Sequence, residues 1–133
     1  MSHDLARRAV ACPRWRWLPG MLATDGVSLA CRVYNDGLVL RWATNIPDWP
    51  LHSVDGNEDF LPDLSDPATL GCLLALVREA WGGPALSVTA GYTKDRKVEW
   101  EVEHPHPDSL PEALWTYFDS EAEALVAALE VTA

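Results

Sequence analysis

The stretch DPATLGCLLALVREAWG, residues 66–82, has the marks of one complete helix and decides where the core lies. Asp66 can accept amide hydrogens of the first turn, and Pro67 suits the first helical position, which needs no backbone donor. Gly82, followed by Gly83, is typical of a left-handed helix stop. Between these ends the apolar residues cover far more than one stripe, which predicts a helix that is buried on all sides.

The same stretch, together with SEAEALVAALE at residues 120–130, resembles a family of small, functionally uncharacterised proteins encoded by phages and prophages. Members of that family have no established activity, so the resemblance transfers no catalytic or binding residue. It implies a genomic setting: a phage accessory protein made in the cytoplasm of a bacterial host.

Length and composition favour a single α+β domain over residues 1–133. Of the 133 residues 48% are hydrophobic and seven are tryptophan, which is enough apolar material for a core and argues against disorder. No segment resembles a secretion signal or approaches the roughly 20 apolar residues of a membrane span. Cys12, Cys31 and Cys72 are few and widely spaced, which indicates reduced thiols. We therefore expect a cytoplasmic protein with no cofactor, metal or membrane contact.

Charge is the strongest global feature of the chain. The formal net charge is -10, from 10 Lys and Arg against 20 Asp and Glu. Residues 1–41 hold six Arg and three Asp, whereas residues 42–133 hold four Lys or Arg and 17 Asp or Glu. Direct binding of nucleic acid needs a basic surface, so this composition argues against it and favours docking onto a basic partner.

Periodicity predicts the remaining elements. A first helix is predicted over residues 2–11, and Pro13 prevents it from continuing. A capping box from Ser120 to Glu123 predicts the start of a last helix, which runs through residue 130. Alternation predicts strands at residues 27–34, 38–42, 85–90 and 97–103, and a short last strand at 113–118, for which a helix begun at Ser109 is the alternative.

This order of elements predicts the α+β class. The antiparallel strands would form a single sheet of four to five strands. The helix over residues 66–82 would be the buried central helix, and the C-terminal helix would pack on one face of the sheet.

Residues 43–65 form an acidic loop, the longest stretch without a regular pattern. A connection of this length is commonly functional or poorly ordered. Its first acids resemble the opening of a calcium loop, but Phe60 replaces the required glycine and Asp66, at the last ligand position, is needed as the helix cap. A calcium site is therefore not predicted.

The predicted partner-binding residues lie in this loop and on the strand over residues 97–103. Val98, Trp100 and Val102 should face the core, which places the alternate glutamates on the opposite face, about 7 Å apart. The predicted contact residues are Glu99, Glu101 and Glu103 of the strand, with Asp55, Glu58, Asp59, Asp63, Trp49 and Phe60 of the loop. The carboxylates would meet Arg and Lys of a partner, and the two aromatic residues would be apolar anchors. A purely solvated strand face produces the same alternation and stays open as an explanation.

With the phage resemblance, these observations favour a protein that acts by binding and not as an enzyme. We predict an anti-defence inhibitor of the anti-CRISPR kind, which mimics nucleic acid and occupies the basic surface of a host defence complex. A phage morphogenesis or scaffolding protein that self-associates, for example as a homodimer, is the alternative. The sequence contains no phosphate-binding loop, nucleophile elbow or HExxH motif.

A small metal-dependent hydrolase is the second alternative. It would use the acidic loop with His52 or His106, but His104 and His106 have no third ligand nearby in the sequence. Residues 14–17, RWRW, alternate basic and aromatic side chains as in single-strand binding sites. A strand with both tryptophans facing inward is the simpler interpretation of that pattern.

Overall fold

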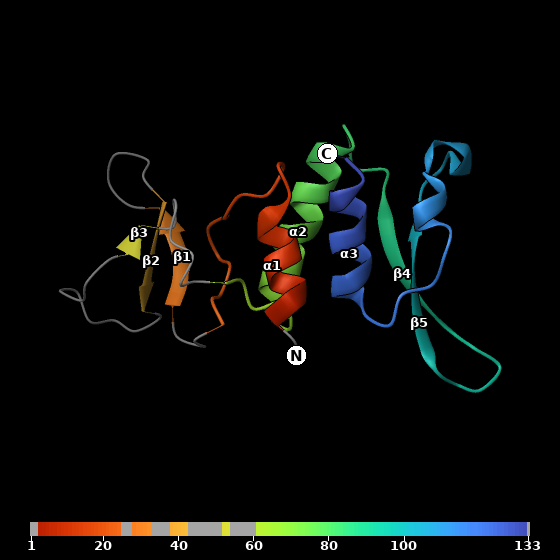
Figure 1. Cartoon of the computed structure of the whole chain (residues 1–133), viewed down its shortest axis with the longest axis horizontal. Coiled ribbons are helices and arrows are strands. Elements are labelled where there is room, and N and C mark those ends of the chain that lie inside the picture. The colour runs from red at the N-terminus through yellow and green to blue at the C-terminus, as the bar shows by residue number, and fades with distance from the viewer. Residues whose placement is uncertain (1–2, 25–27, 33–37, 43–51, 54–60, 133) are drawn as a thin grey trace.

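Three helices stand between two small sheets in the part of the chain that the structure describes (Figure 1). The structure is a computed structural model and describes residues 3–24, 28–32, 38–42, 52–53 and 61–132. The helices are α1 (His3–Ala11), α2 (Pro67–Ala80) and α3 (Glu121–Glu130). The strands are β1 (Ser28–Arg32), β2 (Leu38–Trp42) and β3 (His52–Ser53) at one end, and β4 (Ser87–Tyr92) and β5 (Val98–Glu103) at the other.

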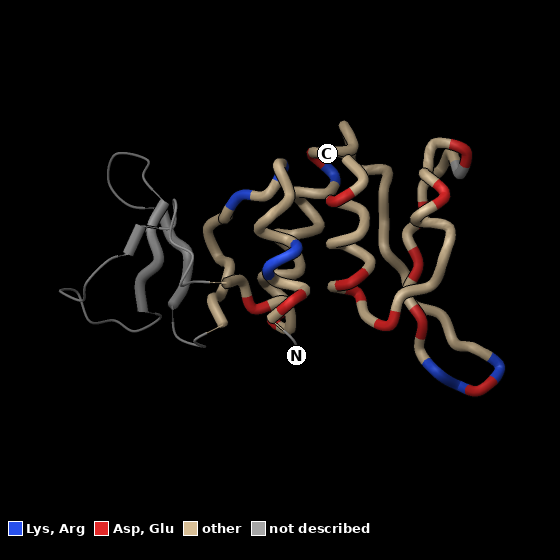
Figure 2. Tube along the Cα trace, in the orientation of Figure 1, with Lys and Arg blue, Asp and Glu red and all other residues tan. Residues whose placement is uncertain are grey.

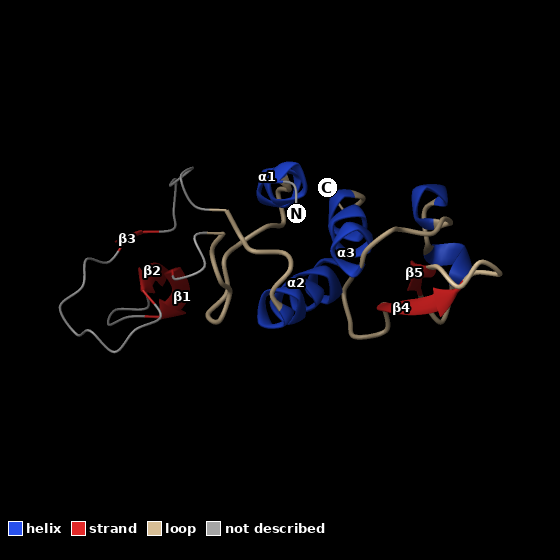
Figure 3. Ribbon diagram, turned by 90° about the horizontal axis from the view of Figure 1, so that it is seen from below, coloured by secondary structure: helices blue, strands red, loops and turns tan. Residues whose placement is uncertain are grey.

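The strands form two sheets, which corrects the prediction of a single sheet of four to five strands. β1, β2 and β3 pair antiparallel in that order, whereas β4 and β5 form a separate two-stranded ribbon. The helices lie between the two sheets in both views of the chain (Figures 1 and 3). Alternation indicates which side of a strand is apolar but not which strands share hydrogen bonds, and for this reason the number of sheets was predicted wrongly. The α+β class is correct.

Both predicted ends of α2 are confirmed. The Asp66 carboxylate accepts a hydrogen bond from the Thr69 amide at 3.0 Å, and Pro67 is the first helical residue. Gly82 has a φ of 82°, and the Gly82 and Gly83 amides donate to carbonyls of the last turn at 3.1 and 2.9 Å. This pair of bonds is the Schellman stop that a left-handed glycine allows.

The buried surface of α2 is smaller than predicted. Leu73, Leu76 and Val77 are buried, but Gly71 and Ala75 on the opposite side are exposed. Leu70 and Leu74, which the prediction counted toward an all-round apolar surface, are only half-buried, so the helix buries one broad side and not its whole circumference.

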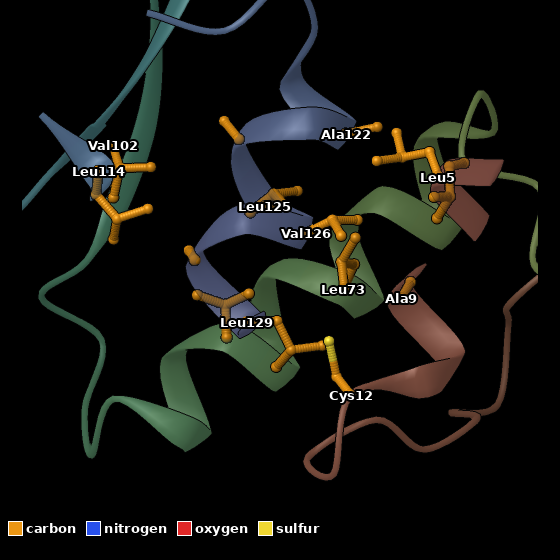
Figure 4. Close-up of a cluster of buried hydrophobic side chains, with 14 of the residues drawn as sticks. Leu5, Ala9, Cys12, Leu73, Val102, Leu114, Ala122, Leu125, Val126 and Leu129 are labelled. Atoms are coloured by element: carbon orange, nitrogen blue, oxygen red, sulfur yellow. The ribbon is translucent and has the colours of Figure 1, made fainter. Parts of the chain in front are cut away.

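The most enclosed helix is α3, which contacts α1, α2, β4 and β5 (Figure 4). Its buried residues are Ala122, Ala124, Leu125, Val126, Ala128 and Leu129. The alanines let neighbouring elements approach closely, while the larger side chains fill the space between them. The core therefore centres on the last helix of the chain. Of the two hydrogen bonds that define the predicted capping box, only the one accepted by Ser120 is confirmed. Ser120 Oγ accepts from the Glu123 amide at 3.1 Å, but the Glu123 carboxylate accepts from the Asp119 amide at 3.2 Å.

Residues 14–17, which follow α1, form no strand, which corrects the predicted strand over these residues. Trp17 is buried and Trp15 half-buried, with their rings edge to face at 5.9 Å, while Arg14 and Arg16 are exposed. The prediction that both tryptophans face inward is therefore correct, although the predicted strand is absent.

The chain leaves for the β1–β3 sheet and returns from it at one point. The Thr24 amide donates to the Leu61 carbonyl and the Asp63 amide to the Leu22 carbonyl, both at 2.8 Å. Thr69 Oγ1 of α2 accepts from the Leu22 amide at 2.9 Å and so ties this point to the helices. Most of the acidic loop, residues 43–51 and 54–60, lies outside the described residues, as do residues 33–37 between the correctly predicted strands β1 and β2.

Residues 107–118 are neither the predicted strand nor the alternative helix. They form two short 3₁₀ turns, Pro107–Ser109 and Glu112–Leu114, followed by a single bridge between Phe118 and Trp100 of β5. The prolines at 107 and 111 interrupt regular hydrogen bonding here. Among the described residues, no helix combines the length and the apolar character that crossing a bilayer requires.

Candidate functional site

The β4–β5 ribbon has one apolar face and one acidic face. Residues directly opposite each other share a face, so Val88 and Val102 lie on one side, and Thr89 and Glu101 on the other. The apolar face packs on α3 at its base, where Val102 is buried. Val98, predicted to be in the core, is 40% exposed because it lies at the far end of the ribbon, paired with the exposed Tyr92.

The acidic face of β5 carries the predicted row Glu99, Glu101 and Glu103. Their partners across the ribbon are Gly91, Thr89 and Ser87, none of which is charged. The salt bridges found among the described residues involve other acids. Within the described part of the chain, this row is therefore not neutralised by a cation.

Within this glutamate row, the pKa of Glu101 is shifted. Partial burial raises the pKa of Glu101, and the neighbouring Glu103 raises it further by a hydrogen bond and by repulsion between the two charges. A raised pKa means that ionising Glu101 costs free energy in the folded protein. A cation placed against the pair would remove that cost.

A pocket of about 390 Å³ lies beside the row, between β5 and the segment that follows it. It is lined by Glu101, Val102, Asp108, Leu110, Leu114, Trp115, Thr116 and Tyr117. The leucines are buried, and Leu114 lies close to Val102 (Figure 4). Trp115 and Tyr117 are 63% and 64% exposed, which is unusual for aromatic side chains of this size. The pocket thus combines buried apolar, exposed aromatic and acidic side chains.

The orientation of the Trp115 ring is fixed. Its indole Nε1 donates to the Leu110 carbonyl at 3.0 Å, and its backbone amide donates to the Glu112 carbonyl at 3.0 Å. An exposed but anchored aromatic ring loses little conformational entropy when a ligand covers it.

The predicted loop residues do not join this site in the described structure. Asp63 lies in the turn before α2, where its carboxylate accepts hydrogen bonds from the Ser65 amide, at 3.0 Å, and from the Ser65 hydroxyl. The other predicted loop contacts lie outside the described residues: Trp49, Asp55, Glu58, Asp59 and Phe60.

Of the residues that line the pocket, only Glu101 was predicted as a site residue from the sequence; those missed include Asp108, Trp115 and Tyr117. The signal available was the proline-rich segment after β5, which indicates irregular chain, followed by closely spaced aromatic residues. Interpreting residues 113–118 as a strand placed those aromatic residues in the sheet instead of at the surface.

The described residues offer little to a metal or to nucleophilic catalysis. The His106 amide donates to His104 Nδ1 at 3.0 Å, so one imidazole nitrogen of this pair is already engaged. No group of three or more His, Cys, Asp or Glu in the described part of the chain is placed to hold a metal ion. Burial raises the pKa of the Cys12 and Cys72 thiols, which lowers the fraction of reactive thiolate.

The turn joining β4 to β5 is basic, in contrast to the acidic positions along β5 (Figure 2). It contains Lys94, Arg96 and Lys97 with one acid, and Arg96 has a φ of 60°. Lys97 is only 3.7 Å from the Asp119 carboxylate, an exposed ion pair of little energetic weight. Comparison of the chain with known protein families, with curated proteins and with solved structures gave no match.

Proposed function

We propose that this chain acts by binding a basic protein, and that the acidic face of β5 occupies a surface on that protein which otherwise holds nucleic acid. The observation that carries the proposal is the Glu101–Glu103 pair. These carboxylates lie side by side without a described cation; partial burial raises the pKa of Glu101, and the hydrogen bond and charge of Glu103 raise it further. An arrangement that costs the free protein stability is favoured when a partner gains from it.

The overall charge supports the same proposal. A protein with a net charge of -10 attracts a basic surface over a distance set by the ionic strength and repels nucleic acid itself. The spacing of about 7 Å along the strand offers repeated negative charge, as a nucleic-acid backbone does. The resemblance of residues 66–82 and 120–130 to phage-encoded proteins would make the partner a defence complex in the bacterial cytoplasm, and the chain an anti-defence inhibitor.

The experiment is a capture assay from bacterial lysate at low and high salt. Tagged wild type is compared with a variant that carries Glu99→Gln, Glu101→Gln and Glu103→Gln. A matched control carries Asp4→Asn, Asp95→Asn and Glu112→Gln, which removes the same charge from exposed sites outside the β5 face. We expect wild type and control to capture a nucleic-acid-handling protein at low salt, and the β5 variant to lose it.

The captured protein is then purified and its binding to nucleic acid is measured with and without the wild-type chain. Displacement of the nucleic acid by wild type, but not by the β5 variant, supports the proposal. Capture that is equal for both triple variants, or nucleic acid that stays bound in the complex, contradicts it. Recovery of only further copies of the chain would favour a self-associating scaffold instead.

A further inference from the structure

The pocket beside β5 has a chemistry that the carboxylate row alone does not explain. Its acids are Glu101 and Asp108, its exposed aromatic residues are Trp115 and Tyr117, and its buried residues are aliphatic. We infer that this pocket receives an arginine side chain of a protein partner, an inference that rests on the proposed function.

Charge decides that the ligand is a cation. Residues 98–118, which include every residue that lines the pocket, contain five acids and no Lys or Arg. A neutral ligand such as a sugar would use the aromatic rings but would gain nothing from such uniform charge. A cationic side chain gains from both, because cations bind favourably over aromatic faces as well as beside carboxylates.

Size and shape favour one side chain over a longer segment. A volume of about 390 Å³ is near the lower end of small-molecule sites, which span roughly 300–1,000 Å³. The buried Val102, Leu110 and Leu114 suit an aliphatic stem, while the acids suit a charged end group.

The aromatic residues favour arginine over lysine. A guanidinium is flat, stacks on aromatic rings and donates two parallel hydrogen bonds to a carboxylate, whereas an ammonium is a compact and strongly hydrated point charge. Trp115 is suited to stacking because its ring is 63% exposed and yet held by the bond to Leu110. A ligand that cannot stack would gain little from an exposed and anchored ring.

The test uses acetyl-arginine amide as the probe and observes the tryptophan indole N–H signals by NMR. The Trp115→Phe variant identifies the Trp115 signal by its disappearance. We expect the arginine probe to shift this signal with weak, millimolar-range affinity, as befits a single side chain. The buried Trp17 signal should stay in place and reports that the fold is intact.

Two comparisons make the result decisive. The uncharged citrulline analogue and the Glu101→Gln, Asp108→Asn double variant should each weaken binding roughly tenfold or more, because the charge-assisted bonds are lost. The lysine analogue should bind more weakly than arginine. An unmoved Trp115 signal, equal binding of citrulline, equal binding of lysine or an unaffected double variant would each overturn the arginine pocket.

The outcome is separable from that of the capture assay. If the probe fails while the β5 variant still loses its partner, the row binds without the pocket, and the inference alone is wrong. If the probe binds as expected but capture is independent of the row, the pocket stands and the proposed function falls.

Discussion

The helical body and the β4–β5 end of the molecule use their charges in opposite ways. In the body, Arg8 of α1 pairs with Glu130 of α3, and both nitrogens of the Arg16 fork contact the Glu79 carboxylate of α2, at 2.7 and 2.6 Å. At the other end, Glu101 lies beside Glu103, and neither is paired with a described cation. Charges in the body connect elements of the fold, whereas the Glu101–Glu103 pair at the ribbon end has no described cationic partner.

Hydrophobic residues divide in the same way. The large side chains of α3 are fully buried, while Tyr92, Trp115 and Tyr117 at the ribbon end are more than half exposed. The body is therefore expected to carry the stability and the ribbon end the binding. The four predictions below test that division.

The largest effect is expected in the body. Leu125→Ala should lower the free energy of unfolding by about 2–5 kcal/mol, because Leu125 is fully buried and a packed core relaxes only partially around the cavity that truncation leaves. Tyr92→Ala, at a side chain that is 82% exposed, should change it by about 0.5 kcal/mol or less. Urea denaturation measures both. Similar losses for the two variants would break the comparison.

Thr69→Val tests the polar link between α2 and the N-terminal segment. The Thr69 hydroxyl donates to the Asp66 carboxylate at 2.9 Å and accepts from the Leu22 amide at 2.9 Å, and the residue is fully buried. Valine keeps the shape but leaves the Leu22 amide without its acceptor, so a loss of about 1–3 kcal/mol is expected. Thr69→Ser, which keeps the hydroxyl, is the control. Denaturation curves that place serine below valine would contradict this role.

Gly71→Ala sharpens the comparison from the exposed side of α2. Gly71 has an ordinary helical backbone, and an added methyl group would meet nothing within 4 Å. Alanine should therefore raise the free energy of unfolding by about 0.5–1 kcal/mol through the lower entropy of the unfolded chain. A loss measured in the same denaturation assay would mean that another surface covers this side of the helix.

Glu101→Gln gives the smallest effect and has a defined dependence on pH. Because the folded-state pKa is raised, the proton favours the folded state, and wild type loses stability as the pH rises above the unfolded value of about 4.3. The variant should be more stable than wild type by about 0.2–1 kcal/mol at pH 7. The difference should vanish near pH 3, where both side chains are neutral. Thermal unfolding at both pH values measures this, with Glu112→Gln as the exposed control.

Local features could be predicted from the sequence, because capping and turn chemistry depend on neighbouring residues. The Asp66 cap, the Gly82 stop and the hydrogen bond at Ser120 are as expected. The pairing of β4 with β5 also follows from local alternation and a short turn.

Features that depend on distant residues could not be predicted in this way. Which strands share a sheet depends on where the helices pack, and α3 reaches its central position only through contacts with both earlier helices and the ribbon. The glutamate row could be predicted from alternation along β5, but the pocket could not. It depends on the bridge from Phe118 back to Trp100, which sets the preceding aromatic residues beside the strand.

The basic turn described above makes the ribbon a dipole. The cations at residues 94–97 and the carboxylate of Glu103 lie at opposite ends of β5, about 20 Å apart from Lys97 to Glu103. A basic surface approaching this strand is repelled at one end and attracted along the rest, so its encounters are oriented before contact is made. The relative orientation of the two proteins is then set during approach. Raising the salt concentration should therefore slow productive association more than it speeds dissociation.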